Sequence, residues 1–404
     1  MNAKQKLPKN AKLLIANDLI YTLTALFIET FLVAYFLKVT NDSIMEVSIF
    51  YIIMYLILGC GNLLIGKVIK IKINYRNKIM SIGIVLRAVF ILFIVILKEN
   101  IAVYFPIVAS LYGISEVFYW VAHEVLFIDV TTNENRKEYM SVKKILGKIT
   151  NIIAPLILGS SIELYSFAKI AIYVFILSVI QIVISLQIKN SNIEQKSPEK
   201  YSIKHFIKNI NNQYKHKVNT FLKSAVSYGV IESSMKTLVV IITIMTFKTS
   251  LNLGILTSIF SVISMIALYL YKKYYNKNNS KAILYSCSIL IFFSIIALIV
   301  DINKTTLIIF NLFYTIGIGI LGTIYDTKKG DLVKECDFER YKEEWVSFVG
   351  IYIAIGRIFG YTVMLIAGIF NNLITFKILL AIVNLFTPVY SWLMYKVEKQ
   401  KEIY

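Results

Sequence analysis

The sequence contains few of the residues from which metal and redox sites are built. It has three cysteines and three histidines among 404 residues. Cys60, Cys287 and Cys336 lie far apart and lack the spacing of a metal-binding or redox motif. No glycine-rich phosphate-binding loop is present in the sequence. We therefore expect no disulfide, no metal or other cofactor, and no ATP-driven mechanism.

Long polar stretches are also scarce. Hydrophobic residues make up 57% of the chain and the mean hydropathy is +0.68, which is too apolar for a soluble globular protein. Apolar runs of about 20 residues, the length that spans about 30 Å of hydrocarbon, recur twelve times. The sequence therefore predicts an all-α integral membrane protein with twelve transmembrane helices.

One polar stretch divides these runs into two sets of six. The segment from Lys189 to Lys223 contains eight lysines and no long apolar run. We predict an N-terminal six-helix half at 1–188, a cytoplasmic central loop at 189–220 and a C-terminal six-helix half at 221–404. The expected helices are 13–37, 45–65, 79–97, 101–122, 145–162 and 168–188, then 221–247, 251–271, 282–300, 305–325, 345–368 and 373–395.

Acidic residues are few relative to basic ones. There are 24 Asp and Glu against 43 Lys and Arg, which gives a formal net charge of +19. Such a charge could indicate nucleic-acid binding, but most basic residues fall at the two termini and in the loops that follow even-numbered helices. Cytoplasmic loops of membrane proteins carry this excess. We predict a multi-pass protein of the cell membrane with both termini in the cytoplasm and no nucleic-acid partner.

The two halves follow the same plan. Asp129 and Asp331 differ by 202 positions, and Arg136 and Arg340 differ by 204. Six helices in each repeat leave both copies in the same orientation. The pattern therefore predicts a parallel duplication about an axis along the membrane normal.

The segment between the fourth and fifth predicted helices, together with the fifth helix, resembles a known family. Asp129 to Arg136, followed by Gly147, Pro155 and Gly159, resembles the loop-4/5 and helix-5 signature of the major facilitator superfamily. The resemblance covers essentially the whole chain at the level of topology. It implies a transporter fold in which two six-helix halves move about a central cavity.

The other motifs of this superfamily are incomplete. Gly66, Arg76 and Lys78 fit the motif between helices 2 and 3, but Lys70 stands about where the family has an acid. Helix 4 lacks the arginine of the drug/proton antiporters and has Glu116 instead. The helix-5 motif of the antiporters is only partly present. The resemblance thus indicates the superfamily and leaves its branch open.

The resemblance also implies that helices 1, 4, 7 and 10 border the cavity. Ionisable groups at membrane depth are costly unless they face the protein interior or water, so charged residues in these helices are candidates for function. Asp18 and Glu29 are eleven residues apart and lie within about 20° of one face of a regular helix. We expect Glu29, Asp18 and Glu116 to couple transport to protons. Arg87 and Arg357 are lone guanidinium groups near helix midpoints, so we expect each to have a carboxylate partner.

Candidates for the substrate cavity share a position near the membrane midplane or on a cavity-bordering helix. They are Arg87, Tyr119, Glu232, Lys236, Asn311, Tyr314 and Arg357. Glu232 and Lys236 are four residues apart in the favourable order for pairing, so mutual neutralisation is an equal alternative to substrate binding. His123 lies at the inner end of helix 4, where a structural or solvated histidine is favoured and a pH-sensing role stays open.

Paired charges in the inner loops form a third set. Asp129, Arg136, Asp331 and Arg340 occupy equivalent positions in the two repeats. We interpret them as clasps between helices that hold one conformational state, rather than as substrate contacts.

These observations predict a monomeric secondary active transporter that works by alternating access, not an enzyme. Its partners would be the lipid bilayer, protons and a small-molecule substrate. We expect proton-coupled efflux of small amphipathic or drug-like compounds, including zwitterionic or anionic ones. The first alternative is a proton symporter that imports a sugar, peptide or organic acid. The second is a membrane enzyme or assembly protein, which the short outer loops and the lack of a catalytic set disfavour.

Overall fold

The computed structural model describes residues 7–131, 136–189, 201–275, 279–370 and 372–399. Side chains at positions 73, 128, 136, 137, 141 and 373 lie outside the description. Helices account for nearly all of the described residues, and no β-strand occurs among them. The predicted all-α class is therefore confirmed.

The first half of the chain begins with a long rod made of three helical segments in direct succession. These are α1 (Lys9–Leu26), the π-helix η1 (Phe27–Leu32) and α2 (Val33–Val39). The remaining helices are α3 (Ile44–Ile71), α4 (Arg76–Leu97), α5 (Ile101–Val130), α6 (Arg136–Leu164) and α7 (Phe167–Gln187), with short 3-10 turns η2 (Ile73–Tyr75) and η3 (Lys98–Asn100).

The second half repeats this order after the short helix α8 (Ile203–Asn209). Its first rod again has three parts, which are α9 (Asn212–Gly229), the π-helix η4 (Val230–Ser234) and α10 (Met235–Phe247). The others are α11 (Ser250–Tyr274), α12 (Ser280–Val300), α13 (Lys304–Glu335), the 3-10 turn η5 (Glu339–Tyr341), α14 (Lys342–Phe370), α15 (Leu373–Asn384) and α16 (Phe386–Lys399).

Eleven segments of the described chain are long and apolar enough to cross a membrane. One of them, Arg76–Phe127, is 52 residues long and contains α4 and most of α5. About 20 helical residues suffice for one crossing, so this segment is long enough for two. The structure is thus compatible with the predicted twelve spans.

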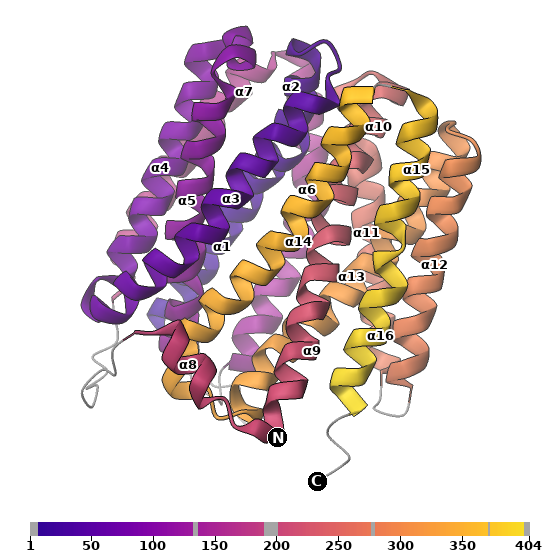
Figure 1. Cartoon of the computed structure of the whole chain (residues 1–404). Helices are drawn as coiled ribbons and strands as arrows, with labels where there is room; N and C mark the ends of the chain where they lie inside the picture. The colour runs from indigo at the N-terminus through magenta and orange to yellow at the C-terminus, as the bar shows by residue number, and fades with distance from the viewer. Residues whose placement is uncertain (1–6, 132–135, 190–200, 276–278, 371, 400–404) are drawn as a thin grey trace.

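The helices form two groups that lean against each other (Figure 1). Two pairs of helices make the most extensive contacts between the first half of the chain and the second, α3 with α14 and α6 with α11. We call these pairs the two seams. The start of α1 and the end of α16 lie at one end of the bundle, together with α8 (Figure 1); we call this the terminal end, and the other the opposite end.

Glycines allow the seams to close. A Cβ atom added at Gly159 of α6 would lie 2.6 Å from the backbone oxygen of Ser250, and one added at Gly254 of α11 would lie 2.3 Å from that of Pro155. In the other seam, a Cβ at Gly368 of α14 would lie 2.7 Å from the backbone nitrogen of Met45. Real Cβ atoms do not come so close to backbone atoms, so these contacts depend on glycine.

The two π-helices occupy equivalent places in the repeat. η1 begins at Phe27 and η4 at Val230, a difference of 203 residues, which agrees with the offsets of 202 and 204 in the sequence. Each π-helix carries one acid, Glu29 in η1 and Glu232 in η4, again 203 residues apart. π-Helical turns are rare and occur frequently at functional sites.

Candidate functional site

Glu29 of η1 pairs with Lys236 of α10, and this ion pair joins the two halves of the chain. The side chains are 36% and 49% exposed, although each lies near the middle of a membrane-crossing rod. The pair is therefore only partly covered by the surrounding apolar packing. Lys236 and Glu232 lie on one helix rod four residues apart, so the ammonium group has a second carboxylate within one turn.

The second acid of the repeat, Glu232, pairs with Arg357 of α14, with 3.1 Å between the carboxylate and the guanidinium nitrogen. Arg357 also lies over the ring of Tyr55 on α3, 5.0 Å from its centroid. The predicted carboxylate partner of Arg357 is thus confirmed. The guanidinium connects η4 to the seam between α3 and α14.

Tyrosines support the π-helix η4. The Tyr314 hydroxyl donates to the carbonyl oxygens of Ile231 at 3.1 Å and Glu232 at 3.2 Å. The Tyr361 hydroxyl donates to the carbonyl oxygen of Ser233 at 3.2 Å. These donors satisfy backbone groups that a wider helical turn leaves without regular partners. The side chain of Tyr314, a predicted cavity residue, is buried against the backbone of the site.

A second charged cluster lies within the first half. Arg87 of α4 is buried and lies 3.4 Å from Glu116 of α5, so its predicted carboxylate partner is also confirmed. The Tyr21 hydroxyl donates to Glu116 at 2.7 Å, and the Trp120 indole donates to it at 3.1 Å. Arg87 stacks over the Tyr21 ring, 4.0 Å from its centroid. Glu116 is therefore neutralised inside one half.

Asp18 is the centre of a third cluster, nearer the terminal end. His123 Nε2 lies 2.6 Å from one carboxylate oxygen, and Lys143 Nζ lies 2.7 Å from the other. The hydroxyls of Tyr139 and Tyr119 donate to the same carboxylate at 3.0 and 3.3 Å. Asp18 is thus a buried acid. Tyr119, a predicted cavity residue, belongs to this cluster.

Ion pairs also join the halves at the terminal end, and we call them the terminal clasp. Arg76 and Lys70 of the first half pair with Glu343 and Glu344 at the start of α14. The remaining pairs are Lys342 with Asp129 and Lys329 with Glu124. Lys70, which departs from the superfamily motif, thus has its own partner at 2.6 Å, and both side chains are buried.

The other predicted clasp residues lie outside these contacts. Asp331 and the side chain of Arg340 are exposed. The backbone oxygen of Arg340, rather than its guanidinium, accepts a bond from Lys70 at 3.5 Å. Arg136 begins α6, and its side chain lies outside the described residues. Asn311 is buried, and its amide oxygen has no hydrogen-bond partner in the described structure.

Sequence reasoning missed two features of the site. A regular helix would place Asp18 and Glu29 on one face, but η1 lies in that stretch and alters the register. Asp18 consequently faces the interior of its own half, while Glu29 reaches the second half. Lys143 was not a candidate, because a lysine near a helix end usually has a solvated charge.

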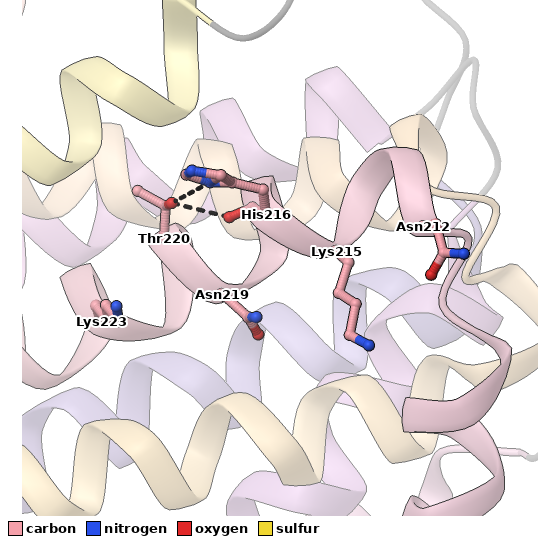
Figure 2. Close-up of a pocket in the computed structure, with 6 residues that line it drawn as sticks. All are labelled: Asn212, Lys215, His216, Asn219, Thr220 and Lys223. Carbon is pink, nitrogen blue, oxygen red and sulfur yellow. Dashed lines mark hydrogen bonds between the residues drawn. The ribbon is translucent and has the colours of Figure 1, made fainter.

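One cavity of about 400 Å³ lies along the first turns of α9, on the terminal side (Figure 2). It is lined by Asn212, Lys215, His216, Asn219, Thr220 and Lys223. None of the predicted site residues contributes to it. No group of three or more metal-ligating side chains occurs among the described residues. Burial raises the pKa of the Cys336 thiol, just after α13, to about 11, so this thiol is protonated and unreactive at neutral pH.

Charged side chains inside an otherwise apolar helical bundle, with ion pairs between its two halves, define a multi-spanning membrane protein of the transporter type. The family model of the Major Facilitator Superfamily matches residues 18–334. The chain therefore belongs to the major facilitator superfamily, as its inner-loop motifs predict.

Solved structures agree with this membership. A bacterial homologue of the iron transporter ferroportin, in its inward-facing state, has a TM-score of 0.66 at 13% identity and covers 98% of this chain and 100% of its own. A nucleoside transporter has a TM-score of 0.70 at 11% identity, with 96% and 100% covered. A peptide transporter has 0.69 at 11% identity, with 97% and 96% covered. These identities are low, so the likeness shows the fold alone. No curated protein matches the chain by sequence.

Proposed function

We propose that the protein is a secondary active transporter that moves a small zwitterionic, amphipathic compound by alternating access and couples this movement to protons. The observation that carries the proposal is the Glu29–Lys236 pair, which joins the halves at partly exposed positions. Alternating access requires contacts that break as one half moves against the other, and a half-exposed ion pair can be broken at low cost.

The balance of charge favours a zwitterionic substrate. Glu29 and Glu232 provide two negative charges at this site, and Lys236 and Arg357 provide two positive ones. Arg87 does not disturb this balance, because it is paired with Glu116. A compound with one group of each sign can replace both partners of an ion pair, whereas a purely cationic or anionic compound leaves one charge unpaired.

Proton coupling follows from the same pair. A proton on the Glu29 carboxylate removes its charge and with it the attraction to Lys236. Lys236 can then turn to Glu232, one turn away on its own rod. Protonation and substrate binding thus act on one contact between the halves, which is the condition for coupling them. Export, rather than import, is the direction that the partial helix-5 antiporter motif at Pro155 and Gly159 favours.

The substrate class can be tested by thermal stabilisation of the detergent-solubilised protein. A panel should contain zwitterions together with cationic and anionic analogues in which one group is blocked. We expect a zwitterion to raise the melting temperature in a concentration-dependent way, because a ligand that binds only the folded protein stabilises it. Stabilisation by cations alone would contradict the charge argument.

The coupling role can be tested in proteoliposomes with the compound so identified. Glu29→Gln mimics the protonated carboxylate, so it should abolish uphill transport driven by a pH gradient and keep downhill exchange. Asp42→Asn, which removes an exposed acid at the opposite end of the same helical hairpin, should leave both unchanged. Undiminished uphill transport by Glu29→Gln would exclude Glu29 as the coupling residue. In intact cells, depletion of the compound on energisation indicates export and accumulation indicates import.

A further inference from the structure

The Asp18 cluster holds more cationic capacity than one carboxylate can neutralise. His123 from α5 and Lys143 from α6 contact the two oxygens of the same carboxylate on α1. Lys143 alone balances the charge of Asp18. A neutral imidazole that donates from Nε2 completes the cluster without adding charge. An imidazolium at the same place would add a second cation.

The imidazole has an atom available for a further proton. Nδ1 of His123 is buried and has no hydrogen-bond partner. A buried acceptor without a donor destabilises the folded protein, because no hydrogen bond replaces those it made with water. Protonation at Nδ1 breaks no hydrogen bond of the ring and strengthens the one from Nε2 to the carboxylate. Histidine is also the side chain whose charge changes most readily between roughly pH 5 and 8.

We propose that His123 is a proton-binding site and that its protonated form displaces Lys143 from Asp18. His123 is 4% exposed and packs against the rings of Tyr119 and Trp120. The Lys143 side chain is 31% exposed, so it is the cation that can move to water when the second positive charge arrives. This inference rests on the proposed proton-coupled function and adds a second proton site to it.

The displacement of Lys143 affects a helix that contacts both halves of the chain. Lys143 belongs to α6, which packs against α1 within its own half and forms a seam with α11 of the other half. The Asp18–Lys143 ion pair ties α6 to α1. When His123 is protonated, this ion pair is lost, and only the hydrogen bond from Tyr139 of α6 still joins α6 to Asp18, while the seam remains. Proton uptake inside the first half therefore weakens the attachment of α6 to α1.

The other charged groups near His123 are already paired. Arg87 on α4 pairs with Glu116, which lies on α5 before His123 and belongs to the second charged cluster. Glu124, the next residue of α5, pairs with Lys329 of α13. Tyr119 and Tyr139 are neutral donors to Asp18. Competition for Asp18 is thus between His123 and Lys143.

Fluorescence of Trp120 can report the protonation directly. Its ring lies edge-on to the His123 imidazole, with 5.4 Å between centroids, and an imidazolium quenches a neighbouring indole more strongly than an imidazole does. The chain has three tryptophans, so Trp345→Phe and Trp392→Phe together leave Trp120 as the only tryptophan. We expect its emission to fall in one transition as the pH is lowered.

Two variants and a control decide the outcome. Lys143→Met removes the competing cation, so the transition should move to higher pH. His123→Gln should abolish it. Lys148→Met is the matched control, since it removes another cation of α6 that contacts Ser264 instead, and it should leave the transition in place. An emission that does not titrate, or a Lys143→Met transition at the unchanged pH, overturns the proposal. Because this titration needs neither substrate nor transport, its failure is distinguishable from a failure of the proposed function.

Discussion

Arg357 and Lys236 carry the same charge beside the same acid, but they lie in different surroundings. The side chains of Arg357 and Glu232 are 22% and 25% exposed, whereas that of Lys236 is 49% exposed. An arginine that loses its carboxylate at such a depth keeps its charge, because guanidinium does not deprotonate in proteins. A half-exposed lysine can turn towards water. Glu232 should therefore matter more for stability than Lys236 does.

We predict that Glu232→Gln destabilises the protein more than Lys236→Met does. The first change leaves Arg357 without its counter-ion, at a cost of about 1–3 kcal/mol; the second leaves a Glu29 carboxylate that is 36% exposed. Melting temperatures of the two variants in detergent measure the difference. The double variant Glu232→Gln with Arg357→Met should recover part of the loss. Equal melting temperatures for Glu232→Gln and the unchanged protein would show that the pair contributes nothing.

Which residues carry charge at membrane depth can be read from the sequence, but their partners cannot. Hydropathy places Glu29, Glu116, Glu232 and Arg357 inside the membrane, and the cost of a lone charge there predicts that the arginines are paired. A helical wheel assumes 3.6 residues per turn, so it fails across η1 and puts Glu29 on the wrong face. The Glu29–Lys236 pair joins residues 207 positions apart, a distance that no local pattern encodes.

At the scale of helices, the seam between α6 and α11 gives a physical reason for the glycine of the helix-5 signature, which the sequence alone does not explain. Gly159 belongs to the superfamily signature of helix 5, and in the structure it meets Gly254 of the other half. The two backbones approach so closely that neither position has room for a side chain. Gly147 lies on the same helix, and a Cβ added there meets nothing within 4 Å.

We therefore predict that Gly159→Ala impairs transport and Gly147→Ala does not. The added methyl group would lie 2.6 Å from a backbone oxygen of α11, so the two helices must move apart. If the methyl group raises the free energy of the state with α6 and α11 in contact by about 1.4 kcal/mol, the population of that state falls about tenfold. Transport of the stabilising compound in proteoliposomes, normalised to reconstituted protein, measures the effect. Gly147→Ala also tests whether a loss at Gly159 reflects helix propensity, since both changes favour the helix. A loss of the same size at both positions would contradict the role of the seam.

For the whole molecule, the terminal clasp holds the two halves together at the end where both termini lie. One of its buried ion pairs is Lys70–Glu344, with side chains 7% and 1% exposed. The superfamily motif alone gave no sign of this pair, because Lys70 departs from it and Glu344 lies 274 positions away. Removing one member of a buried pair leaves the other charge uncompensated, whereas exchanging the two members keeps the attraction. Comparing a single substitution with the exchange of both residues therefore shows whether the attraction between the two charges, rather than either side chain by itself, holds the halves together.

We predict that Lys70→Glu favours the state that is open at the terminal end, because two acids then face each other across the halves. The double variant Lys70→Glu with Glu344→Lys should restore the closed state in part, since the backbone N–H of Ser202 also donates to Glu344 at 3.4 Å and loses its acceptor. Spin labels on the terminal ends of α3 and α14 measure the distance distribution, which should widen in the single variant and narrow again in the double one. Glu339→Gln is the control, because Glu339 is exposed on η5 beside the clasp and its loss should leave the distribution unchanged. A single variant whose distances match those of the unchanged protein would mean that packing along the seams, rather than the clasp, keeps the terminal end closed.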